Sequence, residues 1–295
     1  MTTSPLYFVH ITDTHLNAPT KDTFLKLDTA AHLRAVLAQV RELAFKPAFV
    51  VITGDVAHEG DANDYRFVKQ LVDEESALLG VPILLALGNH DHREPFNEGY
   101  LGQPDSDAAH YFTQEFDGVR VIVLDSHWVG SHSGKLDDEQ LTWLKAQLAM
   151  RAERGTLIFV HHPPHVNSFF PDTDHLLTNS DALAEAIAGS DVIGILSGHV
   201  HLNSVSAFHN ILSVTGQATA FGLDATETRG MRMIEAYGYN LCIVQDGALV
   251  VQSFEMPSSR REILFMTHEQ LAAAMQHRTA EEALNAQVNG AAVHE

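Results

Sequence analysis

The residues best suited to chemistry follow an apolar run in the first third of the chain. Residues 82–87 read Pro-Ile-Leu-Leu-Ala-Leu, and Gly88, Asn89, His90 and Asp91 come directly after them. Amide, imidazole and carboxylate groups coordinate metal ions, and the last two also transfer protons. Gly88 suits such a corner, because a residue without a Cβ lets the backbone turn and approach a ligand closely. Taken alone, these residues are equally consistent with a capped loop, since Asn and Asp are ordinary turn residues.

Four other apolar runs end in residues of the same types. Asp13 and His15 follow residues 7–12, and extended backbone places side chains two residues apart on one face, where both can bind one ion. For this pair alone, a turn aspartate beside an unrelated histidine is the simpler interpretation. Chance is much harder to sustain for the whole set. The other members are Asp55 after 49–53, His161 and His162 after 156–160, and His199 and His201 after 191–197.

The segments between these runs predict how the strand ends are brought together. Apolar residues recur at helical spacing in 29–44, 61–79 and 136–150. Strands that alternate with helices predict parallel pairing with right-handed crossovers. The carboxyl ends of parallel strands share one edge, and ligands bind there. A hairpin over 111–124, turning at Asp117-Gly118, adds antiparallel character, so we expect a mixed sheet.

The C-terminal third has a different pattern. Short β-like runs separated by turns predict a second, largely antiparallel sheet that packs on the first. From residue 258 the sequence becomes polar and alanine-rich. We therefore expect one domain over 1–257 and a helical tail over 258–295, which is a candidate for an oligomer contact. The β-like runs are 203–207, 211–215, 232–237, 239–244 and 248–254.

Composition excludes several classes of function. The 295 residues carry 18 Lys and Arg against 38 Asp and Glu, a formal net charge of -20, which argues against a nucleic-acid polymer as partner. We see neither a signal peptide nor an apolar stretch of membrane-spanning length, and a single cysteine fits a reducing compartment. These observations predict a cytoplasmic protein without a membrane partner.

In order along the chain, the motifs Asp-x-His, Gly-Asp, Gly-Asn-His-Asp, His-x-Pro and Gly-His-x-His resemble those of the calcineurin-like metallophosphoesterase superfamily. The resemblance covers about residues 6 to 202, and the chain is most similar to the class III cyclic-nucleotide phosphodiesterases and the related glycerophosphodiesterases. It implies an α/β (α+β) fold, a four-layer αββα sandwich of two mixed β-sheets flanked by helices, with residues 1–257 as the metallophosphoesterase catalytic domain.

The resemblance also implies a binuclear metal site in which Asp55 bridges both ions. His90 would lie near the leaving group, whereas His92 departs from related enzymes, which often have an acidic residue there. Oxygen and imidazole ligands without thiolate favour manganese or iron, with zinc or cobalt as alternatives. The implied ligands are Asp13, His15, Asp55 and His201 for one ion, and Asp55, Asn89, His161 and His199 for the other.

These residues predict a phosphodiesterase that acts on small phosphodiesters, either cyclic nucleotides such as cAMP or glycerophosphodiesters, by attack of a metal-bridging hydroxide. Asn89 would stabilise the added charge and His90 would assist the leaving alkoxide. His162, His165 and Phe169 are candidates for the substrate pocket, with a solvated loop or local packing as the alternative for each. A phosphomonoesterase, a broad-specificity phosphoesterase and a non-catalytic metal-binding scaffold are the alternative functions. We further expect a homo-oligomer, a dimer or larger.

Overall fold

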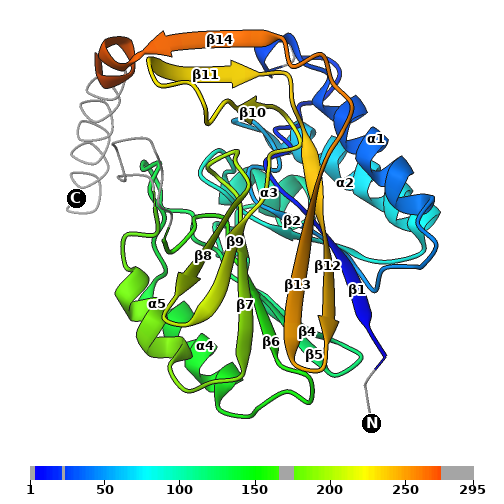
Figure 1. The fold of residues 1–295 in the computed structure, drawn as a ribbon, viewed down its shortest axis with the longest axis vertical. Coiled ribbons are helices and arrows are strands. Elements are labelled where there is room, and N and C mark those ends of the chain that lie inside the picture. Colours follow the sequence, from blue (N-terminus) through cyan, green and yellow to red (C-terminus); the bar gives the residue numbers. More distant parts are fainter. Residues whose placement is uncertain (1–3, 22–23, 166–175, 274–295) are drawn as a thin grey trace.

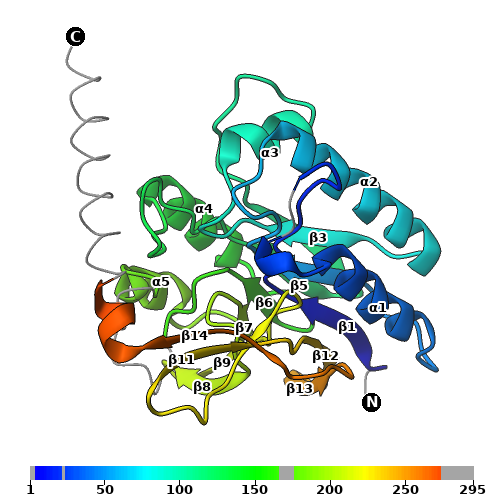
Figure 2. The same cartoon turned by 90° about the horizontal axis from the view of Figure 1, so that it is seen from above.

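Two β-sheets lie face to face between two groups of helices in the computed structural model (Figure 1). The structure describes residues 4–21, 24–165 and 176–273. Seen from above, α1, α2 and α3 cover the outer side of one sheet, and α4 and α5 cover the outer side of the other (Figure 2). The layer order is therefore helices, sheet, sheet, helices, which confirms the fold class predicted from the sequence.

The first sheet has five strands in the order β13-β12-β1-β2-β3. Its three strands β1, β2 and β3 are parallel, whereas β12 runs antiparallel to β1 and β13 antiparallel to β12. The strands are β1 (Leu6–Ile11), β2 (Val50–Thr53), β3 (Ile83–Ala86), β12 (Gly238–Gln245) and β13 (Ala248–Glu255), and the helices of this half are η1 (Phe24–Lys26), α1 (Thr29–Arg41), α2 (Ala62–Leu79) and α3 (Arg93–Gly99).

The second sheet has six strands in the order β4-β5-β6-β7-β9-β8. Strands β5, β6, β7 and β9 are parallel, and the outer strands β4 and β8 pair antiparallel with their neighbours. The elements are β4 (Phe112–Phe116), β5 (Val119–Val123), β6 (Thr156–Phe159), β7 (Val192–Ser197), β8 (Ser204–Phe208) and β9 (Ile211–Thr215), with helices α4 (Asp138–Leu148) and α5 (Ser180–Ile187).

Alternating side chains of the buried strands supply three apolar layers. Val9 on β1 faces α1 and α2, whereas its neighbour Phe8 faces the second sheet. On the other side, Ile122 of β5 faces α4 and α5, and Val121 faces the first sheet. Phe8 also meets Phe159 of β6 edge to face across the interface, with ring centroids 5.8 Å apart. Strands buried on both faces read as continuous apolar runs, which is why the sequence shows them so clearly.

A small third sheet, in the order β10-β11-β14, lies beyond the ends of the other two (Figure 1). It is antiparallel and consists of β10 (Gly222–Leu223), β11 (Gly230–Ile234) and β14 (Glu262–Thr267). Strand β14 falls within the segment predicted to be a helical tail, and a helix begins only at residue 268. Ile263, Leu264 and Phe265 favour a strand there, and partly buried residues alternate with exposed ones along Glu262–Phe265.

The predicted arrangement of strands was wrong in two respects. The C-terminal runs do not form one separate sheet, because β8 and β9 extend the second sheet, β12 and β13 extend the first, and β11 joins the third. The ligand-bearing strands also do not share one sheet, since β1, β2 and β3 lie in the first and β6 and β7 in the second. Alternation of apolar residues marks a strand but carries no information about its neighbour.

Among the helices in the described parts of the chain, none is long and apolar enough to cross a membrane.

Candidate metal centre

The carboxyl ends of strands from both sheets meet at one place. At the end of β1, Asp13 donates its backbone N–H to the carbonyl of Gly54, which follows β2. Across the sheet interface, His161 after β6 donates from Nδ1 to the carbonyl oxygen of Thr53 at 2.8 Å. The backbone N–H of His199, after β7, reaches both carboxylate oxygens of Asp13 at 3.1 and 3.0 Å. Two sheet ends therefore enclose one site.

One group of ligand-type side chains consists of Asp13, His15, Asp55 and His201. All four are buried, and one ligand atom of each lies within 4.8 Å of the others. His201 Nε2 is 3.3 Å from Asp13 Oδ1 and 3.3 Å from His15 Nε2. Two carboxylates and two imidazoles at these distances form a donor set that a first-row divalent ion can occupy.

A second group surrounds His161. Its Nε2 lies 3.4 Å from Asp55 Oδ2 and 3.1 Å from Asn89 Oδ1, and its ring centroid is 5.1 Å from that of His199. Asp55 Oδ2 is also 3.7 Å from His15 Nε2. The carboxylate of Asp55 thus lies between the two groups, where it could bridge two ions.

Backbone carbonyls fix which nitrogen of each imidazole faces the site. His201 donates from Nδ1 to the carbonyl of Phe221 at 2.9 Å, and His161 donates from Nδ1 to Thr53. A carbonyl oxygen only accepts, so Nδ1 carries a hydrogen, and the neutral ring has its lone pair on Nε2, the atom directed at the group. Both rings therefore have the orientation that a metal ligand needs.

His162 lies next to the second group, and its ligand atom is within 4.8 Å of those of His161 and His199. However, its Nε2 is 3.0 Å from the backbone carbonyl of His132, and its Nδ1 is 2.8 Å from Ser126 Oγ. The carbonyl requires a hydrogen on Nε2, so Nδ1 accepts from the serine hydroxyl. Both nitrogens are occupied, so Asn89 and Asp55, rather than His162, complete this group.

Five residues of the two groups have left-handed backbone conformations. Positive φ is uncommon for residues other than glycine, and it costs free energy that the surrounding structure must supply. The residues alternate along the loops after β1 and β7, which places both side chains of each loop at the site. Their φ values are 52° for Asp13, 43° for His15, 47° for Asp55, 71° for His199 and 53° for His201.

Two glycines allow the strand ends to come this close. A Cβ on Gly88 would lie 2.2 Å from Asp55 Oδ1, and one on Gly198 would lie 1.8 Å from Thr12 Oγ1. Either contact is far shorter than van der Waals distance. Gly88 and Gly198 are therefore required for packing as well as for the turn before Asn89 and before His199.

Mutual electrostatics of the buried groups are strong. Burial lowers the pKa of His161, but the charge of Asp55 and their contact outweigh this effect and raise it to about 9. Conversely, burial raises the pKa of Asp55 and of Asp13, and the neighbouring imidazoles outweigh this and lower both. Burial lowers the pKa of His15. Buried carboxylates that remain charged among imidazoles suit a site for cations.

A further set of side chains borders the site next to His90. Glu59 accepts from His90 Nδ1 at 2.7 Å and from His92 Nε2 at 2.9 Å, so one carboxylate holds both rings. Burial lowers the pKa of His90, but Asp55 and then Glu59 outweigh it, and the pKa is raised. The His90 ring lies 4.8 Å from the ring of His58.

Sequence reasoning missed His58, Glu59 and His132. The first two follow Asp55 at three and four residues, and this proximity to a strand-end carboxylate was a usable signal. His132 is in a loop without a recognisable pattern, and its Nδ1 lies 3.0 Å from Asn89 Nδ2. No feature of the sequence points to that contact.

Other predicted residues have different positions. His165 is exposed, and Phe169 lies outside the described residues. Asp91 is fully buried and accepts hydrogen bonds from the backbone N–H groups of Val56, Ala57 and Gly88 and from the hydroxyl of Tyr65. It therefore ties the loop after β3 to the loop after β2.

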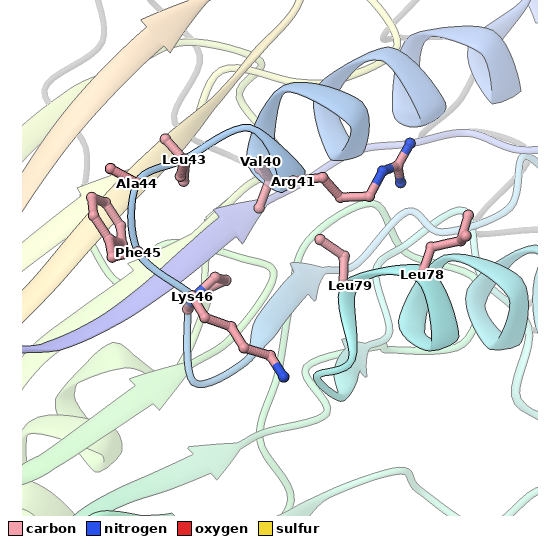
Figure 3. A pocket seen from close by; sticks show the side chains of 9 residues that line it. Val40, Arg41, Leu43, Ala44, Phe45, Lys46, Leu78 and Leu79 are labelled. Atoms are coloured by element: carbon pink, nitrogen blue, oxygen red, sulfur yellow. The ribbon is translucent and has the colours of Figure 1, made fainter.

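A surface pocket of about 260 Å³ lies between the C-terminal ends of α1 and α2, away from the ligand groups (Figure 3). Most of the residues that line it are apolar, and Arg41 and Lys46 add two cationic side chains. None of the predicted site residues lines this pocket. The remaining lining residues are Val40, Leu43, Ala44, Phe45, Pro47, Leu78 and Leu79.

Comparison with known proteins agrees with this geometry. The family model for calcineurin-like phosphoesterases matches residues 6–203. A probable cyclic nucleotide phosphodiesterase of Rhodococcus erythropolis is 34% identical over 251 residues, which cover 83% of this chain and 81% of that protein. A probable glycerophosphodiester phosphodiesterase of Arcobacter nitrofigilis is 30% identical over 212 residues, 70% of this chain and 76% of that protein. A dimetal phosphatase structure from Danio rerio has the same fold, with a TM-score of 0.55 at 17% identity over 83% of this chain and 98% of that one.

Proposed function

The chain belongs to the calcineurin-like phosphoesterase family, and on this premise we propose that it is a metal-dependent phosphodiesterase that hydrolyses small phosphodiesters. One observation carries the proposal: the Asp55 carboxylate lies between two groups of buried ligand-type side chains. A shared carboxylate is what two adjacent ions require. The fold alone does not require one.

The donor set supports two first-row ions. Asp13, His15, Asp55 and His201 would hold one, and Asp55, Asn89, His161 and His199 the other. The oxygen and imidazole donors of these groups suit manganese, iron, zinc or cobalt. When bound, such a pair of ions supplies positive charge for the phosphoryl oxygens and lowers the pKa of a water molecule.

Residues of the chain would supply orientation and a proton. His90, whose pKa is raised, is held through Nδ1 by Glu59 and can present the proton of its other nitrogen to the leaving alkoxide. His161 and His201 cannot turn away, because their Nδ1 hydrogens are bonded to backbone carbonyls. Bound ions would make the site locally positive, although the whole chain has a net charge of -20.

Cyclic nucleotides and glycerophosphodiesters are the substrate classes that we propose. The names of the two relatives above support both, and each has a phosphodiester that fits the charge of the proposed centre. The same proposal includes manganese or iron as the native ions, a cytoplasmic location and a homo-oligomer. Size-exclusion chromatography with light scattering tests the last of these.

The test combines metal analysis with two pairs of substrates. We expect the protein prepared with manganese to contain two ions per chain and to hydrolyse bis-p-nitrophenyl phosphate faster than p-nitrophenyl phosphate. Comparison of cAMP with a glycerophosphodiester then separates the two substrate classes. A clear preference for the monoester would contradict the proposal in favour of a phosphomonoesterase. Two bound ions without turnover of any of these compounds would indicate a metal-binding scaffold.

A further inference from the structure

We propose that His132 is a positioning residue that holds the side-chain amide of Asn89 with its oxygen toward the second metal ion. The inference rests on the proposed function, since it concerns the binding of that ion. His132 lies in the loop of residues 126–134, which joins β5 to the segment before α4. No motif marks this histidine, and it lies 43 residues from Asn89 along the chain.

The two ends of the Asn89 amide have different partners. Oδ1 is 3.1 Å from His161 Nε2, and Nδ2 is 3.0 Å from His132 Nδ1. Only the oxygen of an amide can bind a metal ion, and the nitrogen only donates. His132 Nδ1 must therefore accept this bond, which places the hydrogen of its ring on Nε2. Rotation of the amide by half a turn would direct its NH2 group at the ion and its oxygen at the lone pair of His132 Nδ1. His132 therefore favours the orientation that binds metal.

His162 explains why His132 can do this. The Nε2–H of His162 donates to the backbone carbonyl of His132, and its Nδ1 accepts from Ser126 at the start of the same loop. His162 is completely buried, and a Cβ on Gly134, at the end of the loop, would lie 2.4 Å from its ring. The ring thus holds the loop at its start, near its middle and at its end. His162 supports the second metal site through His132, rather than by binding substrate.

The consequence is specific to one ion. Asn89 is a neutral ligand, and it belongs to the group of His161 rather than to that of His15 and His201. Removal of a residue that orients a metal ligand typically lowers metal affinity by about 10- to 100-fold. We expect this loss at the second ion, with little change at the first.

The experiment is a titration of the metal-free, full-length protein with Mn²⁺. Binding is measured by calorimetry and by electron paramagnetic resonance. We expect His132→Ala to weaken the second binding step by about 10- to 100-fold and to remove the spin-coupled signal of the ion pair at two equivalents of Mn²⁺. His132→Asn keeps an acceptor oxygen near the position of Nδ1 and should restore both. The control is His209→Ala, which removes an exposed histidine at the β8–β9 turn and should bind as the wild type does.

A second background isolates the amide. Asn89→Asp has two equivalent oxygens, so its orientation no longer matters, and His132→Ala should change the second step little when added to it. Wild-type affinity for the second ion in His132→Ala would overturn the inference. The inference would also be overturned if His132→Ala lost both ions and His132→Asn did not restore them. This pattern would indicate a general structural role. Failure of the wild type to bind two ions would instead contradict the proposed function.

Discussion

At the scale of single residues, the environment of a side chain decides its role more than its type does. His161 and His162 are neighbours in sequence, are both buried and have rings 4.8 Å apart. The first directs Nε2 at Asp55, whereas the second has both nitrogens bonded to the loop of residues 126–134. Only the first is available to a metal ion. The chemistry of the site therefore depends on hydrogen bonds that no pattern in the sequence shows.

Glu59→Gln tests the pairing of His90. We expect kcat for the diester to fall on the order of tenfold, because the glutamate holds the ring and stabilises its proton. Glu59 contributes to the raised pKa of His90, so its loss lowers that pKa. A general acid must be protonated, and activity is lost as the pH rises through its pKa. The alkaline limb of the kcat profile should therefore move to lower pH. The control is Glu98→Gln on α3, a partly exposed glutamate that pairs with Arg66. An unmoved limb would exclude His90 as the acid.

His10 provides a test of stability against pH. It is buried in β1, and burial lowers its pKa to about 3 despite the opposing charge of Asp13. The unfolded chain binds this proton below about pH 6.5, and the folded chain does not until about pH 3. The free energy of unfolding should therefore fall as the pH drops through this window, by up to about 1.4 kcal/mol per pH unit from this group. In urea unfolding of metal-free protein at several pH values, His10→Gln should show a smaller slope; an identical slope would refute the assignment.

The sequence predicted the residues that directly follow strands but not those farther along the loop of residues 126–134. Asp13, Asp55 and His201 were recognisable because each follows an apolar run and a short motif. His132 and Ser126 come from an irregular loop, and their contacts depend on how β5 and β6 pair. A contact between positions far apart in sequence is a property of the fold, and it has no local signal.

At the scale of elements, the strand ends hold the site in a strained and closely packed form. The loops after β1 and β7 both alternate left-handed residues, and Gly88 and Gly198 fit against side chains of neighbouring loops. The fully buried strands and the amphipathic helices α1, α2 and α4 were predicted, because they have clear periodicities, whereas α5 and β14 were not. The neighbours of each strand in its sheet were not predicted. Strands β8, β9, β12 and β13 look alike in sequence and yet extend different sheets.

Gly198→Ala tests this packing. The new Cβ would lie 1.8 Å from Thr12 Oγ1 and 2.5 Å from Asp13 Oδ2, so the loops after β1 and β7 must separate. Overpacking of this kind typically costs about 1–3 kcal/mol, and we expect a lower melting temperature together with weaker Mn²⁺ binding. Gly102→Ala is the control, because no atom lies within 4 Å of its new Cβ and only the cost of its positive φ remains. Normal metal binding in Gly198→Ala would show that the loops tolerate separation.

At the scale of the whole molecule, the proposed centre joins the two sheets. Asp13, His15, Asp55 and Asn89 come from loops of the first sheet, whereas His161, His199 and His201 come from loops of the second. Elsewhere the sheets are held together by an apolar layer that includes Phe8, Phe49 and Phe159. Bound ions would add a polar connection at one end of this layer.

Metal removal should therefore lower global stability. A ligand that binds only the folded state stabilises it by about 4 kcal/mol per site at a thousand times its dissociation constant. We expect chelation by EDTA to lower the melting temperature, and addition of Mn²⁺ to restore it. In Asn89→Ala, Mn²⁺ should raise the melting temperature by less than in the wild type, because the substitution affects one site. A melting temperature independent of Mn²⁺ would contradict binding of ions between the sheets.

The place of β1 in its sheet affects how the molecule is made. This strand begins at residue 6, yet it pairs on one side with β12, whose residues 238–245 lie more than two hundred positions later. While the chain leaves the ribosome, β1 and β2 can pair early, but the other edge of β1 stays open until most of the protein has been synthesised. Such distant pairing is slow, and open edges attract other chains. Newly made molecules should therefore depend on chaperones until translation has passed β12, and fragments that end before it should aggregate.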